Sequence, residues 1–331
     1  MTKNDGNSVT GGPENQSLVS QTAAYGAGYS ADEWASIERI RADSSYLQAD
    51  RDADFLREDP VRGVRLQIDY LKPELLLQEH GIDHTIVVFG SARISRPSVA
   101  RALCRELNDA LEKNPGDAEL LRSLAIAIQI ENKSRYYEMS REFGRIVGRS
   151  GMGPQDSRVT LMTGGGPGCM EAANRGADDV GAKSIGLNIA LPREQYPNPY
   201  ITPGLAFSLH FFGMRKLHLL KRAKALVAFP GGYGTLDEFF ETLTLVQTGK
   251  IDPVPIVLIG ESFWKKAIDF DFLVEEGVIN AGDRALFKYA DTAQAAWDSI
   301  LAWYADRGEE LVGIERRTLG RREQDPQNDK R

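Results

Sequence analysis

The sequence predicts an α/β protein built on a doubly wound parallel sheet with helices on both faces. Short apolar runs alternate with amphipathic segments of helical period along most of the chain, as βαβ units do. Several runs are apolar throughout, which is typical of strands buried on both faces of a parallel sheet. Three runs end in turns of glycine and other small residues, as do strands that bind ligands at their carboxyl ends.

The predicted elements follow one another in the order that such a sheet requires. Strands are expected at residues 85–92, 158–168, 183–191, 205–212, 225–232, 255–260 and 286–290. Helices are expected at residues 96–113, 117–149, 214–224, 236–247 and 292–305, with a further helix ending near Asp179. We assign this alternation to a Rossmann-like domain at residues 82–307.

The ends of the chain differ in composition from this domain. Residues 1–30 are rich in Gly, Ser, Asn and Gln, so a disordered tail is expected there. Residues 31–81 carry apolar side chains at helical spacing, which predicts a helical extension broken at Pro73. Residues 308–331 are charged and are expected to form a frayed tail.

Charge and cysteine content argue against several functional classes. The 331-residue chain has a formal net charge of −7, so neither nucleic acid nor an anionic membrane is an expected partner. The N-terminus lacks an apolar signal-peptide core, and the apolar runs are too short to span a bilayer. The two cysteines show no metal-ligand spacing. A cytoplasmic protein without a disulfide framework or a zinc site is therefore expected.

An anion site is predicted where three strands end, in FGSAR (residues 89–93), TGGGPGCMEAANRGA (163–177) and PGGYGTLDE (230–238). Backbone N–H groups at the start of a helix attract an anion, and glycine lets the anion approach closely. Neither glycine turn matches GxGxxG or GxxxxGK[ST], which argues against a P-loop NTPase. Any one such turn is more often ordinary turn geometry than a ligand site, but their occurrence together favours one shared phosphate site.

The residues Thr235 and Glu238 allow two interpretations. They stand three residues apart near a predicted helix start, which fits a capping box with Thr235 as the N-cap. Alternatively, Thr235 donates its hydroxyl to a phosphate and Glu238 faces a bound ligand. The residue pattern alone leaves both interpretations open.

Together the motifs resemble those of the LOG ("Lonely guy") family, the cytokinin riboside 5'-monophosphate phosphoribohydrolases, whose members are often labelled lysine decarboxylases. PGGYGTLDE fits the family's PGGxGTxxE motif, and GGGPGCM with EAANRGA is similar to its second glycine loop. GMRKLHLL (residues 213–220) is similar to its arginine-lysine helix. The extension at 31–81 and a helical insert at 114–133 resemble longer bacterial members, some of which are similar to general nucleoside-monophosphate nucleosidases.

The resemblance implies hydrolysis of the N-glycosidic bond of a nucleoside 5'-monophosphate, AMP-like or a cytokinin riboside monophosphate, to free base and ribose 5-phosphate. It implies Glu238 and Arg215 as catalytic residues, no cofactor, and a homodimer or larger homo-oligomer. The substrate-binding residues expected from the turns and the resemblance are Ser91, Arg93, Gly165, Gly166, Gly168, Met170, Lys216, Gly231, Gly232, Gly234, Thr235 and Glu241. The alternative is a non-catalytic protein of the same fold that binds a nucleotide or molybdenum cofactor.

Overall fold

The computed structural model describes residues 28–151, 156–190 and 196–311. The chain divides into two compact units, Met1–Arg65 and Leu66–Arg331. Of the two tails expected from composition, only residues 28–30 and 308–311 fall within the described ranges. Within those ranges, no helix is long and apolar enough to cross a membrane.

The first unit consists of short helical elements. Helix α2 (Ala31–Ala42) is followed by the 3₁₀ turns η1 (Ser44–Tyr46), η2 (Phe55–Arg57) and η3 (Asp59–Val61) and by the start of α3 (Arg62–Glu79). A capping box starts α2, because the Ser30 side chain accepts from the Glu33 N–H and the Glu33 carboxylate accepts from the Ser30 N–H. Arg65 donates to the carbonyl oxygens of Leu56 and Glu58, which ties the turns to the helix.

The second unit is built on a seven-stranded parallel sheet. Its strands are β1 (His84–Phe89), β2 (Val159–Thr163), β3 (Ser184–Ile189), β4 (Ala206–Leu209), β5 (Ala223–Ala228), β6 (Ile256–Ile259) and β7 (Phe287–Ala290). They lie in the order β4-β3-β2-β1-β5-β6-β7, and each neighbouring pair is parallel. The predicted doubly wound sheet is confirmed. The direction of winding reverses between β1 and β5, the position at which such sheets bind ligands.

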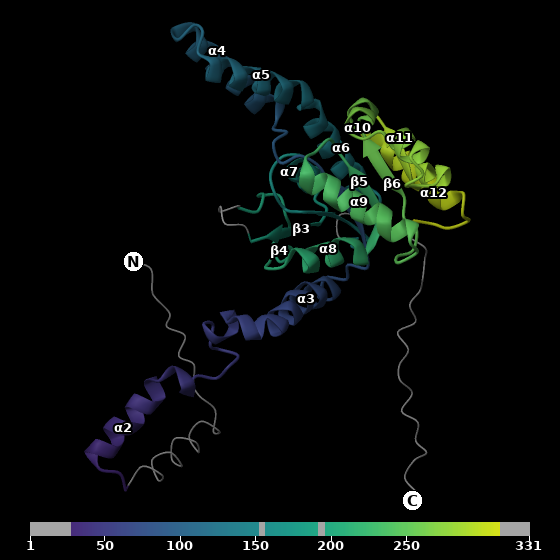
Figure 1. Ribbon diagram of the computed structural model, residues 1–331. Helices are drawn as coiled ribbons and strands as arrows, with labels where there is room; N and C mark the ends of the chain where they lie inside the picture. Colours follow the sequence, from purple (N-terminus) through teal and green to yellow (C-terminus); the bar gives the residue numbers. More distant parts are fainter. Residues whose placement is uncertain (1–27, 152–155, 191–195, 312–331) are drawn as a thin grey trace, which may run out of the picture. The chain divides into compact units, whose positions relative to one another are not determined.

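Helices pack on both faces of this sheet (Figure 1). One face is covered by α6 (Arg135–Arg149), α7 (Cys169–Asp178) and α12 (Ala293–Ala305). The other is covered by α3 from Leu66 onward, α8 (Phe212–Lys221), α9 (Tyr233–Gln247), α10 (Glu261–Ala267) and α11 (Phe270–Glu275). Strand β1 serves both cores, since Ile86 and Val88 are buried on one side and Val87 and Phe89 on the other. Its apolar run is therefore the signature of a strand buried on both faces.

The predicted helix break at Pro73 is wrong. Helix α3 continues through this proline to Glu79. A proline removes one backbone donor from a helix, but Glu74 and Leu77, which follow it, are buried in the second unit. Their tertiary contacts outweigh the local cost of the proline.

Two other helix boundaries also differ from prediction. The helix expected at 117–149 is divided at Ser134 into α5 (Ala118–Lys133) and α6. Helix α5 packs on α4 (Pro97–Lys113), so the expected insert at 114–133 consists of α5 and the connection before it. The helix expected to reach residue 224 ends at Lys221, because Ala223 already pairs with Thr85 of β1.

The three strand-end turns meet at the backbone of Ser91. The Ser91 N–H donates to the Pro230 carbonyl oxygen at 3.0 Å, and the Ser91 carbonyl accepts from the Cys169 N–H at 3.1 Å. Strand β1 lies between β2 and β5, so the turn that follows it reaches both neighbouring turns. Gly168 allows this approach, since it has a φ of +76° and a Cβ there would overlap the Ser91 carbonyl oxygen.

We predict that Gly168→Ala lowers the free energy of unfolding by about 2 kcal/mol or more, because alanine is strained at positive φ and would displace Ser91. Urea unfolding monitored by circular dichroism measures the loss. Gly213→Ala is the matched control, because a Cβ at this position in α8 meets no atom within 4 Å. Equal stability of the two variants would contradict the proposed constraint on Gly168.

Candidate active site

A pocket of about 540 Å³ opens beside the β1–β5 junction, where the three turns converge. Eight of the predicted site residues line it: Ser91, Arg93, Met170, Arg215, Gly232, Gly234, Thr235 and Glu238. The remaining six do not: Gly165, Gly166, Gly168, Lys216, Gly231 and Glu241. All three turns and helix α8 therefore contribute to one concave site, as expected at the switch point of an open α/β sheet.

The pair Glu238–Arg215 lies in this pocket. The Glu238 carboxylate is 2% exposed, and its Oε1 accepts a hydrogen bond from Arg215 Nη2 at 3.1 Å. Its Oε2 has no hydrogen-bond partner among the described residues, and the same holds for Arg215 Nε. Buried polar atoms are normally hydrogen-bonded, so these two atoms are suited to a ligand.

Burial raises the pKa of Glu238 above its ordinary value, because the surrounding protein disfavours the charged carboxylate. The positive charges of Arg215 and Lys216 act in the opposite direction. Carboxylates with a raised pKa beside a cation in a pocket are candidates for a functional role.

The capping-box interpretation of Thr235 and Glu238 is wrong. Helix α9 begins at Tyr233, with Gly232 as its N-cap, so Thr235 is already inside the helix. In the described part of the chain, no side-chain hydrogen bond caps the start of this helix. Glu238 lies in the second turn rather than the first and pairs with Arg215. The extended backbone of Gly232 lets the helix start early, and its carbonyl oxygen accepts from the N–H groups of Thr235 and Leu236, each at 3.0 Å.

Lys216 and Glu241 belong to a neighbouring ion cluster. Lys216 Nζ lies 2.9 Å from Glu241 Oε2 and 2.8 Å from Asp237 Oδ2. Lys216 and Glu241 line a separate cavity between α8, α9 and the start of β5. Their ion pairs link α8 and α9, and neither residue lines the pocket that contains Glu238.

Gly165, Gly166 and Gly231 do not line the pocket but shape the turns around it. Asn198 donates its backbone N–H to the Gly165 carbonyl and its side-chain amide to the Gly166 carbonyl. The Gly165 N–H donates to the hydroxyl of Thr163. Gly231 leaves room for the Thr235 side chain, which a Cβ there would overlap.

Six residues that line the pocket were not identified as site residues from the sequence: Phe89, Gly90, Ala92, Gly164, Tyr233 and Leu236. A Cβ on Gly164 would lie 2.9 Å from Met170 Sδ and 4.0 Å from Arg215 Nη1, so this glycine makes room for both. Tyr233 lines the pocket with 93% of its surface exposed. Both stand inside the quoted glycine motifs, but their exposure and neighbours depend on how the turns converge.

Helix α3 holds the start of α8, the helix that carries Arg215. Asp69 Oδ2 accepts from the backbone N–H groups of His210, at 2.7 Å, and Phe211, at 2.9 Å. Phe211 is the N-cap position of α8, and no side chain of its own segment caps it. A carboxylate from another helix therefore satisfies donors that a local cap usually serves.

The other end of α8 is held by Glu74. The guanidinium of Arg222 donates two hydrogen bonds to the Glu74 carboxylate, each 2.9 Å long, and Lys221 Nζ lies 2.9 Å from it. The hydrogen bonds from Arg222, followed by that from Lys221, lower the pKa of Glu74 from 4.5 to about 2 despite its burial.

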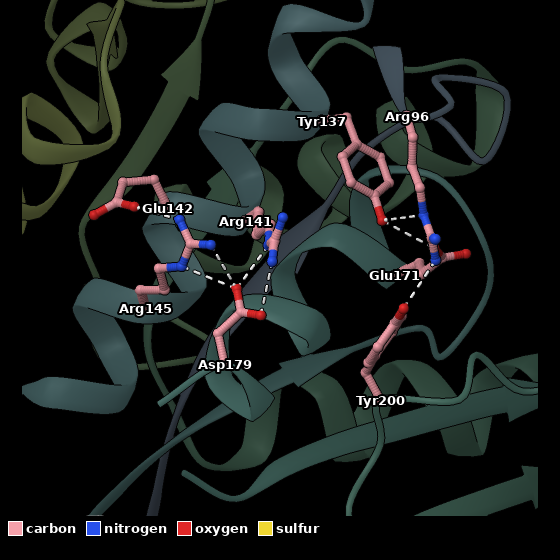
Figure 2. A network of polar contacts seen from close by, with 8 residues as sticks. All are labelled: Arg96, Tyr137, Arg141, Glu142, Arg145, Glu171, Asp179 and Tyr200. Atoms are coloured by element: carbon pink, nitrogen blue, oxygen red, sulfur yellow. Dashed lines mark hydrogen bonds and ion pairs between the residues drawn. The ribbon is translucent and has the colours of Figure 1, made fainter. Parts of the chain in front are cut away.

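Ion pairs hold helix α7, which begins directly after the second glycine turn (Figure 2). Near its start, Glu171 accepts from Arg96 at 2.6 Å and from the hydroxyl of Tyr137 at 2.9 Å. Arg96 also donates to the hydroxyl of Tyr200 at 3.0 Å. Since Arg96 follows the first turn closely in sequence, this network links the first and second turns.

The end of α7 is fixed by a second group of ion pairs (Figure 2). Arg141 and Arg145 of α6 both bind the carboxylate of Asp179, with nitrogen–oxygen distances of 2.6 Å and 2.7 Å. The hydrogen bond from Arg141 is the main cause that lowers the pKa of Asp179. In the described ranges, no group of three or more His, Cys, Asp or Glu side chains could hold a metal ion.

Comparison with known proteins places the chain in a family. A family model described as a possible lysine decarboxylase matches residues 170–300. The cytokinin riboside 5'-monophosphate phosphoribohydrolase LOG3 of Arabidopsis thaliana is 30% identical over 167 residues, covering 49% of this chain and 73% of the relative. This chain belongs to the LOG family.

Another LOG-family relative is the probable cytokinin riboside 5'-monophosphate phosphoribohydrolase LOGL3 of Oryza sativa subsp. japonica. It is 31% identical over 156 residues, which cover 45% of this chain and 72% of the relative. A solved structure, the X-ray structure of the structural genomics target TM1055, is 20% identical and covers 65% of this chain and 96% of its own, with a TM-score of 0.38. At that TM-score it adds nothing to the fold assignment, which rests on the strand pairing.

In this LOG-family protein we expect Glu74→Gln to be less stable than the wild type at neutral pH and nearly as stable at pH 2. The folded-state pKa of Glu74 lies below its ordinary 4.5, so the stabilisation is complete above about pH 4.5 and is lost as the pH falls toward 2. Urea unfolding of both proteins across this range measures the difference. A difference that does not shrink with falling pH would rule out an ionic role for Glu74.

Proposed function

We propose that this protein hydrolyses the N-glycosidic bond of a nucleoside 5'-monophosphate to free base and ribose 5-phosphate. The observation that carries the proposal is the buried Glu238 carboxylate, paired with Arg215 beside the glycine turn at the start of α9. The phosphoribohydrolase names of the two relatives agree with this reaction.

The 5'-phosphate would bind at the start of α9. Gly232, Gly234 and Thr235 line the pocket there, and the helix start presents N–H groups and a positive dipole end to an anion. Gly232 and Gly234 have no Cβ to keep the phosphate away from the backbone. The Thr235 side chain is free to donate its hydroxyl to a phosphate oxygen, because Thr235 does not cap the helix.

Glu238 would then face the ribose. Loss of the base leaves positive charge on the sugar, and a carboxylate at this position stabilises that charge. Glu238 Oε2 is suited to accept a hydrogen bond from a ribose hydroxyl or from the attacking water. Water supplies a hydroxyl to the anomeric carbon and a proton to the leaving base, and Arg215 reduces negative charge on that base or holds Glu238 in place.

A non-catalytic nucleotide-binding role is the competing proposal. A binding protein needs the glycine turns but has no need of a buried carboxylate with an unpaired oxygen, which costs free energy on folding. The Glu238–Arg215 pair therefore favours catalysis.

We also propose a homo-oligomer. Light scattering at micromolar concentration tests this proposal against the monomer mass of 36.6 kDa.

The reaction is tested by measuring free base released from AMP, GMP and isopentenyladenosine monophosphate by chromatography. We expect release from at least one of them, and the comparison of the three identifies the accepted base. Binding of all three without any release would overturn the proposed hydrolysis and support the binding role.

Replacing Glu238 by Gln is expected to lower kcat about 100-fold or more and to change the nucleotide dissociation constant little. Glutamine keeps the size and the hydrogen-bonding oxygen but removes the negative charge that stabilises the sugar cation. Glu241→Gln is the control, because Glu241 lies outside the pocket and binds Lys216. Unchanged turnover in Glu238→Gln would reject the catalytic role.

The pH dependence of kcat/KM gives an independent test. Burial raises the pKa of Glu238, so the active carboxylate should be lost, as pH falls, at a higher pH than for an ordinary glutamate. Arg215→Gln removes a charge that lowers this pKa and should shift the acid limb of the residual activity further upward. Rates of base release from AMP between about pH 4 and about pH 9 show the limb. If Arg215→Gln does not shift the acid limb, the limb belongs to a group other than Glu238.

A further inference from the structure

A second pocket adjoins the candidate active site and is assigned no role by the proposed function. Its volume is about 490 Å³, and we call it the α5 pocket because α5 forms one wall. The two pockets share Ser91, Arg93 and Gly232, so the third glycine turn lies between them. A ligand bound at this turn can therefore reach both.

Helix α5 contributes one continuous face to this pocket. The residues on that face are Arg122, Ala125, Ile126, Gln129, Ile130 and Lys133, which follow the three- and four-residue spacing of one helix side. Ile94 and Phe263 also line the pocket, so much of the lining is apolar. The pocket thus offers an apolar surface next to the glycine turn.

The charged residues of the α5 pocket all have the same sign. Arg93, Arg122 and Lys133 line it, and no carboxylate does. None of these three cations forms an ion pair with another residue in the described part of the chain. Unpaired cations beside an apolar wall favour a ligand that is anionic at one end and apolar at the other.

The position of Glu238 determines which part of a nucleotide can enter the α5 pocket. Glu238 and Arg215 line only the first pocket, and the α5 residues line only the second. If the 5'-phosphate binds at Gly232 and the ribose lies at Glu238, the base remains on the Glu238 side. A group that passes the turn into the α5 pocket must then be attached to the phosphate itself.

We propose that the α5 pocket binds a second phosphate and an apolar ester group attached to the 5'-phosphate, so that the preferred ligands are nucleoside 5'-diphosphate esters. Arg93, Arg122 and Lys133 bind the second phosphate, and Ile94, Ile126 and Phe263 contact the ester group. The proposal rests on the proposed function for the position of the 5'-phosphate, but it requires binding rather than turnover.

The test compares the dissociation constants of AMP, ADP and the phenyl ester of ADP by calorimetry. Glu238→Gln is the host protein, so that turnover does not consume the ligand. We expect ADP to bind about tenfold more tightly than AMP, since a charge-assisted hydrogen bond of this kind is worth a factor of that order. The phenyl ester should bind more tightly still. ADP binding no more tightly than AMP would overturn the proposal.

Variants of α5 show whether the preference arises in this pocket. In the double variant Arg122→Gln/Lys133→Gln, the ratio of the AMP and ADP dissociation constants should fall to near one. In Ile126→Ser, the phenyl ester should bind no more tightly than ADP. Arg101→Gln, which removes one cation from the neighbouring α4 outside the pocket, should keep the wild-type ratios. An unchanged ratio in the double variant would overturn the proposal. If the double variant is unfolded by circular dichroism, the single variant Arg122→Gln decides in the same way.

The two proposals fail separately. A preference for ADP that depends on α5, without base release from any nucleotide, would overturn the hydrolysis and keep the α5 pocket. Base release from AMP together with equal affinities for AMP and ADP would keep the hydrolysis and overturn the α5 pocket. Absence of binding by AMP, ADP and the phenyl ester would overturn the α5 pocket, while base release from AMP, GMP or isopentenyladenosine monophosphate decides the hydrolysis.

Discussion

The backbone of Ser91 is the point at which the candidate site is held together. Its N–H and carbonyl join the turns that follow β5 and β2, so three strand ends form one concave surface. The approach is close enough that Gly90 and Gly168 cannot carry a Cβ without overlap, at Gly90 with Cys169. Since the contacts are made by the backbone, glycine spacing rather than side-chain chemistry sets the shape of the pocket.

The Glu238–Arg215 pair depends on elements far apart in the sequence. Glu238 comes from α9 and Arg215 from α8, and α3 holds α8 at both ends through Asp69 and Glu74. Burial of Glu238 disfavours its charged form, while Arg215 favours that form. A small movement of α8 would change this balance, which gives the ion pairs of α3 a direct link to the chemistry of the pocket.

Helix α5 gives the protein a second compartment that continues the first. Gly232 lines both pockets, so a phosphate bound at this turn would lie between them. Glu238 and Arg215 lie on one side, and cations without an ion pair among the described residues lie beside an apolar wall on the other. The hydrolytic machinery and the selection of the phosphate substituent would thus be separate properties of the chain, carried by different helices.

The sequence by itself determined the parallel sheet and its strands, because buried strands and helical periodicity are local signals. Its short motifs led to Glu238 and Arg215 through the family resemblance, and their catalytic role stays a proposal. Tertiary structure decided what depends on packing between distant segments. It carries α3 through Pro73, starts α9 ahead of Thr235, and directs Lys216 to Glu241 instead of the pocket. It also places α5 beside the glycine turn. No local sequence pattern predicts these outcomes, because each depends on the burial and the ion pairs that elements distant in the sequence provide.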